Sequence, residues 1–312
     1  MTGPPLVPPI PRISIYEAQA QNRTRTVLLI LGFALVVGVL AYVFGQLFLP
    51  QGGLAMLPVA LAFSGGSAFV SYFAGDKLVL AQSHARPVGT DEQLELRNIV
   101  ETLGIGIGIP TPKLYLIDDS APNAFATGRD PKHASVAVTT GLLDKLDRQE
   151  LEGVIAHELS HVGNRDIRVM LLVTVMVGTI ALLSDWLLRS MFWGGGRSRD
   201  DRDRGNGGGL ILILGLVLAV LTPVIAGLIQ MAVSRQREYL ADASGALLTR
   251  YPPGLANALR KIAADREPLE VANKATASLY FANPLKDRPI QFDRLFDTHP
   301  PIEERIRRLE AM

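Results

Sequence analysis

Four long apolar stretches dominate the pattern of hydrophobic and polar positions along the chain. Asp185 is the only charged residue within them, and they cover residues 27–49, 54–74, 169–188 and 210–232. Each has about 20 residues or more, enough to cross a hydrocarbon layer about 30 Å thick as an α-helix. Buried core helices are the alternative, but four such runs in one chain make it the weaker one. We therefore predict four transmembrane helices.

The distribution of basic residues predicts the orientation of these helices. Three arginines precede the first stretch, and nine Lys or Arg residues lie near the predicted cytoplasmic ends against five at the outer ends. The positive-inside rule then places the N-terminus in the cytoplasm. The predicted organisation is a cytoplasmic segment 1–26, helices one and two in 27–74, a cytoplasmic catalytic part 75–168, helices three and four in 169–232 with a Gly/Arg/Asp-rich loop 194–209, and a cytoplasmic helical part 233–312.

Composition narrows the possible chemistry. Hydrophobic residues make up 48% of the 312 positions and the mean hydropathy is +0.24, which agrees with a membrane protein. A net charge of +1 without basic clusters argues against a nucleic-acid partner. Because the chain has no cysteine, any metal must be held by His and carboxylate side chains.

The pentapeptide His157-Glu158-Leu159-Ser160-His161 is the strongest chemical signal. Side chains four residues apart share one face of a helix, so His157 and His161 can bind the same ion. Glu158 lies beside them, where a carboxylate can act as general base toward a water at the metal. A solvated helix with two histidines is the less specific alternative. The pattern favours a catalytic zinc site.

The surrounding sequence predicts an α+β fold class with a small β-sheet packed against the helix that carries this motif. Asp147 and Glu150 form a capping box at the start of that helix. Other predicted elements are a helix over Asp91–Leu103, strands over Lys113–Ile117, Ala124–Thr127 and Ser135–Thr139, and a last helix over Pro301–Leu309. We expect the strand over Ser135–Thr139 to present a free edge on which an extended peptide can lie as an added strand.

A catalytic zinc ion needs a third protein ligand, and Glu238 is the best candidate. His161 precedes the third apolar stretch by about as many residues as separate Glu238 from the fourth, so antiparallel helices would bring both to one level. Asp242, one turn later, can accept a hydrogen bond from the second ring nitrogen of a ligating histidine. The alternative is that Glu238 and Asp242 form a solvated face paired with Arg235 or Arg237.

Several motifs, in the same order along nearly the whole chain, resemble the HtpX family of membrane-bound zinc metalloproteases, relatives of the eukaryotic CAAX prenyl endopeptidase. The motifs are Tyr16 and Asn22-Arg23, Ala85 to Val88, Pro122 to Gly128, His157 to Asp166, Ser234 to Asp242, and Thr298 to Pro301. The resemblance implies a zincin-like cytoplasmic catalytic domain carrying an HExxH motif. It also implies one Zn²⁺ per chain bound by His157, His161 and Glu238, with Glu158 as the base.

Two further residues take tentative roles from the resemblance. Asn123 and His299 would line the cleft near the substrate carbonyl, where either can help to stabilise the oxyanion. Asn123 can equally be a turn residue before a strand, and His299 can equally cap the last helix. Both alternatives stay open at this point.

The predicted function is a multi-pass endopeptidase of the bacterial cell membrane with its active site facing the cytoplasm. The resemblance implies protein quality control and stress response, with misfolded membrane or cytoplasmic polypeptides as substrates. The alternatives are a non-catalytic membrane scaffold stabilised by zinc, a specific prenyl-peptide protease, and a transporter. With Asp185 as the only ionisable residue of the apolar stretches, the transporter is disfavoured. The sequence does not name the oligomeric partners or the specific substrates.

Overall fold

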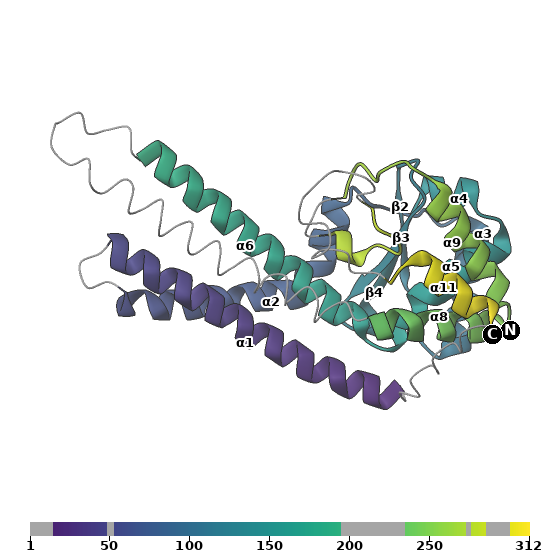
Figure 1. The fold of residues 1–312 in the computed structure, drawn as a ribbon, viewed down its shortest axis with the longest axis horizontal. Coiled ribbons are helices and arrows are strands. Elements are labelled where there is room, and N and C mark those ends of the chain that lie inside the picture. Colours follow the sequence, from purple (N-terminus) through teal and green to yellow (C-terminus); the bar gives the residue numbers. More distant parts are fainter. Residues whose placement is uncertain (1–14, 49–52, 195–234, 273–275, 285–299) are drawn as a thin grey trace, which may run out of the picture.

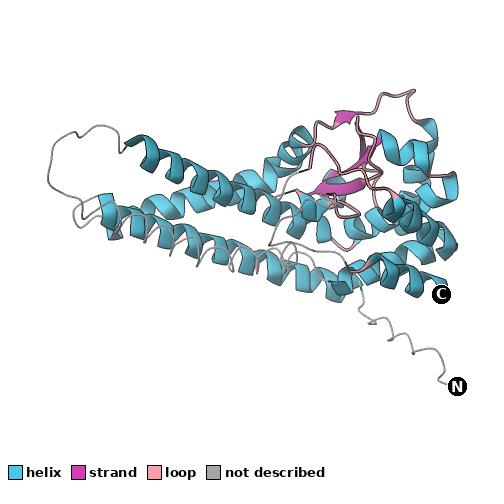
Figure 2. Cartoon of the chain, turned by 45° about the horizontal axis from the view of Figure 1, so that its top comes forward, coloured by secondary structure: helices cyan, strands magenta, loops and turns pink. Residues whose placement is uncertain are grey.

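The computed structural model describes residues 15–48, 53–194, 235–272, 276–284 and 300–312. Three long helices extend to one side of a globular part (Figure 1). They are α1 (Ile15–Phe48), α2 (Leu57–Gln82), which follows a 3-10 turn over Leu54–Met56, and α6 (Asp166–Gly194). The globular part holds the sheet and the remaining described helices (Figure 2).

The three long helices pack on one another through apolar side chains, among them Phe33 of α1, Ala60 of α2 and Met176 of α6. Within the described residues, two segments are long and apolar enough to cross a membrane, Ala20–Tyr42 and Leu54–Gln82. Helix α6 covers the third predicted stretch, but its crossing of a membrane stays a prediction. The fourth predicted stretch lies outside the described residues, as does most of the loop 194–209.

A four-stranded mixed sheet with the order β1-β2-β4-β3 forms the centre of the globular part. Strand β2 runs parallel to β4, whereas β1 pairs with β2 and β3 pairs with β4 in antiparallel fashion. The strands are β1 (Arg86–Pro87), β2 (Lys113–Ile117), β3 (Ala124–Gly128) and β4 (Ala134–Thr139). Alternate residues point to opposite faces, and both faces are covered.

One face of the sheet packs on the helices of the globular part. Their shared core joins side chains from distant segments, including Val136 of β4, Ile155, Leu259 and Leu309. The helices are α3 (Leu94–Ile107), α4 (Thr140–Lys145), α5 (Arg148–Gly163), α8 (Arg235–Thr249), α9 (Pro252–Ala264) and α11 (Ile302–Glu310), with short 3-10 turns at Pro131–His133 and Ala277–Leu279. The described residues of 75–168 and 235–312 therefore contribute to one hydrophobic core.

The other face of the sheet rests on the base of the long helices. Phe125 and Ala137 contact a cluster that includes Val79 of α2 and Leu171 of α6. The globular part and the long helices are thus joined through buried apolar contacts, which fixes α6 relative to the strand β3.

The structure differs from two sequence predictions. The helix predicted to begin at Asp91 begins at Leu94, because Gln93 has a left-handed backbone with φ of +52°. The prediction of a free edge at Ser135–Thr139 was wrong, since β4 lies between β2 and β3. The strand that ends the sheet next to β4 is β3.

Candidate metal centre

Helix α5 carries the motif in the middle of the globular part. Its start is fixed by the predicted capping box, in which the Asp147 side chain accepts from the Glu150 N–H and the Glu150 side chain accepts from the Asp147 N–H. Helix α8 crosses it closely, because Gly245 lies against the backbone of His157. The close crossing brings the Glu238 side chain to the histidines.

Three side chains converge on one point, as the sequence predicted. The Nε2 atoms of His157 and His161 lie 3.2 Å apart. The Glu238 carboxylate lies 3.7 Å from Nε2 of His157 and 3.5 Å from Nε2 of His161. Ligand atoms about 2.1 Å from a tetrahedral ion are about 3.4 Å apart. The three residues, each at most 4% exposed, therefore fit a divalent metal such as zinc.

His157 is held from the C-terminal part of the chain. Its Nδ1 lies 2.9 Å from Oδ1 of Asp242, as the spacing of Asp242 predicted. Arg305 of α11, which is fully buried, donates to both carboxylate oxygens of Asp242 at 2.9 and 2.7 Å. Because Nδ1 of His157 faces this carboxylate, its Nε2 is directed to the other two ligands.

His161 is held from the side of the long helices. Its Nδ1 lies 3.0 Å from Oδ2 of Asp166, the first residue of α6. The other oxygen of Asp166 accepts from Nδ2 of Asn22 at 2.7 Å and from Nη1 of Arg237 at 3.3 Å. Thus each candidate ligand histidine has its own buried aspartate, and each aspartate has its own arginine.

The two imidazoles differ in pKa because of these partners. Burial disfavours the charged form of both rings. Burial and the positive charge of Arg305 lower the pKa of His157 to about 4, against the effect of Asp242. At His161, Asp166 and the neighbouring carboxylates outweigh burial and raise the pKa to about 9. A metal ion bound by His161 would therefore have to displace a proton.

Glu158 is buried beside the ligands and bound to the sheet. Its Oε2 accepts the backbone N–H of Ala126 in β3 at 2.8 Å. This contact places the carboxylate between the metal ligands and the end strand of the sheet. That is the position a general base needs if a peptide is to lie along β3.

Residues 280–282 lie along the outer edge of β3. The N–H of Phe281 donates to the Ala124 carbonyl at 2.8 Å. The Asn123 side chain donates to the Ala282 carbonyl at 3.1 Å and accepts the Ala124 N–H at 3.1 Å. Asn123 thus binds this segment and the start of its own strand.

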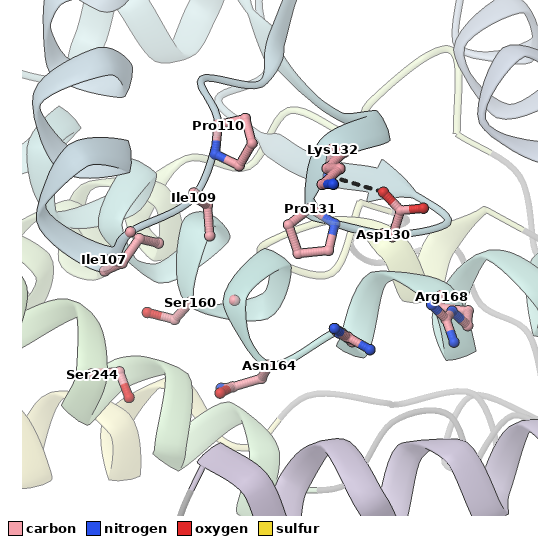
Figure 3. Close-up of a pocket in the computed structure, with 13 residues that line it drawn as sticks. Ile107, Ile109, Pro110, Asp130, Pro131, Lys132, Ser160, Asn164, Arg168 and Ser244 are labelled. Atoms are coloured by element: carbon pink, nitrogen blue, oxygen red, sulfur yellow. Dashed lines mark hydrogen bonds between the residues drawn. The ribbon is translucent and has the colours of Figure 1, made fainter.

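A cavity of about 630 Å³ opens at the C-terminal end of α5. Ile109 and Pro110 line one wall, and Ser160 and Asn164 line the helix side (Figure 3). None of the three candidate ligands lines it. The metal centre and this cavity are therefore separate in the described part of the chain.

The sequence of the chain matches a known peptidase family. The profile described as Peptidase family M48 matches residues 90–312. The chain belongs to this family. A "Protease HtpX homolog" from Thermoanaerobacter pseudethanolicus is 46% identical over 96% of this chain and 99% of its own length. A second "Protease HtpX homolog", from Dictyoglomus thermophilum, is also 46% identical, over 96% of this chain and 95% of its own length. The protein is thus a metalloprotease homologous to HtpX, as the resemblance implied.

A solved structure, of Ste24p from S. mikatae, has 20% identity and a TM-score of 0.42 over 81% of this chain and 64% of that one.

The sequence prediction missed three side chains around the metal centre. Asp166, Arg305 and Asn22 received no role, although all three are buried there. A polar residue at the start of an apolar helix, five positions after His161, was the signal that could have found Asp166. His299 lies outside the described residues, so its tentative role stays a prediction.

Proposed function

We propose that the protein is a membrane-embedded zinc endopeptidase in which His157, His161 and Glu238 bind the metal and Glu158 is the general base. The observation that carries this proposal is the convergence of the three ligand side chains in a buried site next to the Glu158 carboxylate. Two histidines and a glutamate are a donor set typical of catalytic zinc in peptidases.

The chemistry assigns one task to each side chain. A bound zinc ion would supply a Lewis acid for the scissile carbonyl. Glu158 takes the proton of the attacking water and then gives it to the leaving amine. Asp242 and Asp166 keep the two imidazoles in the tautomer that presents Nε2.

The substrate lies along β3 in this proposal. Ala126 and Ala124 have backbone groups directed to the outer edge of the strand, where Glu158 and Phe281 bind them in the structure. An extended peptide that took the place of residues 280–282 at this edge would have its carbonyl beside Glu158, whatever its side chains are, which supports a broad choice of substrates. Asn123 at the start of β3 and His299 remain the candidates for oxyanion stabilisation.

The long helices and the charges at their ends support the proposed location. Two helices suited to a membrane and the packing of α6 against both support a multi-pass protein of the bacterial cell membrane. The positive-inside rule supports an active site on the cytoplasmic side. We propose misfolded membrane or cytoplasmic polypeptides as the substrates, in protein quality control.

The test is the substitution Glu158→Gln in the full chain, purified in detergent. Glutamine keeps the shape and can still bind the Ala126 N–H by its carbonyl oxygen, but it cannot take a proton. We expect zinc content to be unchanged and cleavage of casein to fall by about 10²–10⁴-fold. Cleavage at the rate of the unmodified protein would reject Glu158 as the base.

A scaffold in which zinc only stabilises the fold is the alternative. Its test is cleavage of casein by the unmodified protein, with and without a chelator. Loss of cleavage with the chelator and recovery with added zinc support the protease. The scaffold would be favoured if the chelator unfolds the protein and casein is not cleaved either with or without the chelator.

A further inference from the structure

Helix α1 reaches the metal centre through the side chain of Asn22. Asn22 is 4% exposed and lies near the start of the apolar segment Ala20–Tyr42. Its Nδ2 donates to the Asn164 carbonyl at 3.1 Å and to Oδ1 of Asp166 at 2.7 Å. One amide therefore bridges the end of α5 and the start of α6.

The junction between α5 and α6 needs such a support. Arg165 between the two helices has a left-handed backbone with φ of +61°. The carbonyl of Asn164 belongs to the end of α5, where the helix itself offers no donor. The Asn22 amide supplies a donor to this carbonyl and, in the same place, to the carboxylate that follows it.

Asp166 is fixed through both of its oxygens. Oδ2 faces Nδ1 of His161 at 3.0 Å, and Oδ1 receives the bonds from Asn22 and Arg237. The bond from Asn22 is the shorter of the two by 0.6 Å, from printed distances of 2.7 and 3.3 Å. A carboxylate held in this way sets the ring orientation of the histidine that it binds.

Nearby polar side chains of α1 behave differently. The hydroxyl of Thr24 donates to the Ala20 carbonyl, and that of Thr26 donates to the Asn22 carbonyl, so both bind their own helix. The Asn22 amide instead binds residues more than 140 positions away. Asn22 therefore links a helix long and apolar enough to cross a membrane to Asp166, which binds a candidate ligand histidine.

We propose that Asn22 is a positioning residue for the metal centre, acting on His161 through Asp166. The inference rests on the proposed zinc site. It adds that the affinity of the site depends on a side chain of α1, the first long helix, which lies far from the zinc motif in sequence. Partners that bind a ligating histidine typically change metal affinity by about 10- to 100-fold when removed.

The experiment compares zinc affinity of four full-length chains in detergent: unmodified, Asn22→Ala, Asp166→Asn, and the double variant. Competition with a chromophoric chelator gives the dissociation constants, and the visible spectrum of the Co²⁺ form reports ligand geometry. We expect Asn22→Ala to weaken zinc binding about tenfold and to shift the Co²⁺ bands. In the Asp166→Asn background, the same change should have less than half of that effect on a logarithmic scale, because Asn22 acts through Asp166.

The controls separate this role from simple packing. Thr24→Ala removes a polar group from the exposed side of α1 and should leave zinc affinity unchanged. Asn22→Ser keeps a hydrogen-bond donor in a smaller side chain, and it is used if Asn22→Ala does not fold. We expect it to weaken zinc binding threefold to tenfold.

Three results would overturn the proposal: unchanged affinity in Asn22→Ala, an effect at least half as large when Asp166 is already replaced, or an equal loss in Thr24→Ala. Failure of the unmodified chain to bind zinc is a different result, because it rejects the metal site itself.

Discussion

The two candidate ligand histidines are held by the same kind of partner, but from different regions of the molecule. His157 is bound by Asp242, which in turn is bound by Arg305, both in the C-terminal part of the globular core. His161 is bound by Asp166 at the start of α6, which in turn is bound by Asn22 of α1. One half of the metal centre is therefore built within the globular part, and the other half is shared with the long helices.

This difference also appears in charge. Arg305 is fully buried against the aspartate that holds His157, and it helps to lower the pKa of that imidazole. At His161 the neighbouring carboxylates outweigh burial and the pKa is raised. The two histidines therefore differ in their electrostatic surroundings, although each is bound by a buried aspartate.

The largest expected effect comes from replacing either ligand histidine, because the metal site then cannot form. His157→Ala and His161→Ala each delete a ligand, so each should lose zinc and lower kcat/KM on casein by about 10³-fold or more. His133→Ala is the matched control, because this exposed imidazole binds Asp130. A variant of either ligand that keeps both zinc and activity would show that the two halves do not form one site.

Replacing Arg305 or Arg237 should lower the stability of the fold by different amounts in the two halves of the site. Arg305→Met leaves Asp242 buried without its cation and should lower the free energy of unfolding by about 3–5 kcal/mol. Arg237→Met should cost about 1–2 kcal/mol, because Asp166 keeps its bond from Asn22. Thermal unfolding in detergent measures both. Equal losses would contradict the difference in how the two aspartates are held.

The smallest expected effect concerns the packing of α5. A Cβ at Gly245 of α8 would meet the His157 backbone nitrogen at 3.0 Å, whereas a Cβ at Gly163, two residues after His161, has its nearest contact at 4.0 Å. We expect Gly245→Ala to destabilise the fold by about 1–3 kcal/mol. Gly163→Ala should be neutral or slightly stabilising, because alanine favours a helix. The opposite order in thermal unfolding would contradict the close crossing of α8 at His157.

The sequence predicted the parts of the site that follow helical spacing. His157, Glu158 and His161 lie within about one turn, and Asp242 follows Glu238 by one turn, so helical periodicity was sufficient to place them together. Asn22 and Arg305 could not be predicted, because their partners lie 144 and 63 residues away and hydrogen bonds of this range leave no periodic pattern.

The strands show the same limit. Their positions followed from short apolar runs, and β2, β3 and β4 lie within one residue of the predicted bounds at each end. Their order did not, because three short runs of similar composition do not indicate which of them lies at the end of the sheet. Strand β4 was therefore predicted as the end strand, whereas β3 has that place, contacts Glu158 and is covered on its outer edge by residues 280–282.

The metal content of the purified full chain tests the central claim most directly. Elemental analysis of the unmodified protein, Glu158→Gln and Glu238→Ala, after dialysis against zinc-free buffer, should give about one zinc per chain for the first two and much less for the third. The absence of zinc from the unmodified protein, or an equal content in Glu238→Ala, would contradict a site formed by His157, His161 and Glu238.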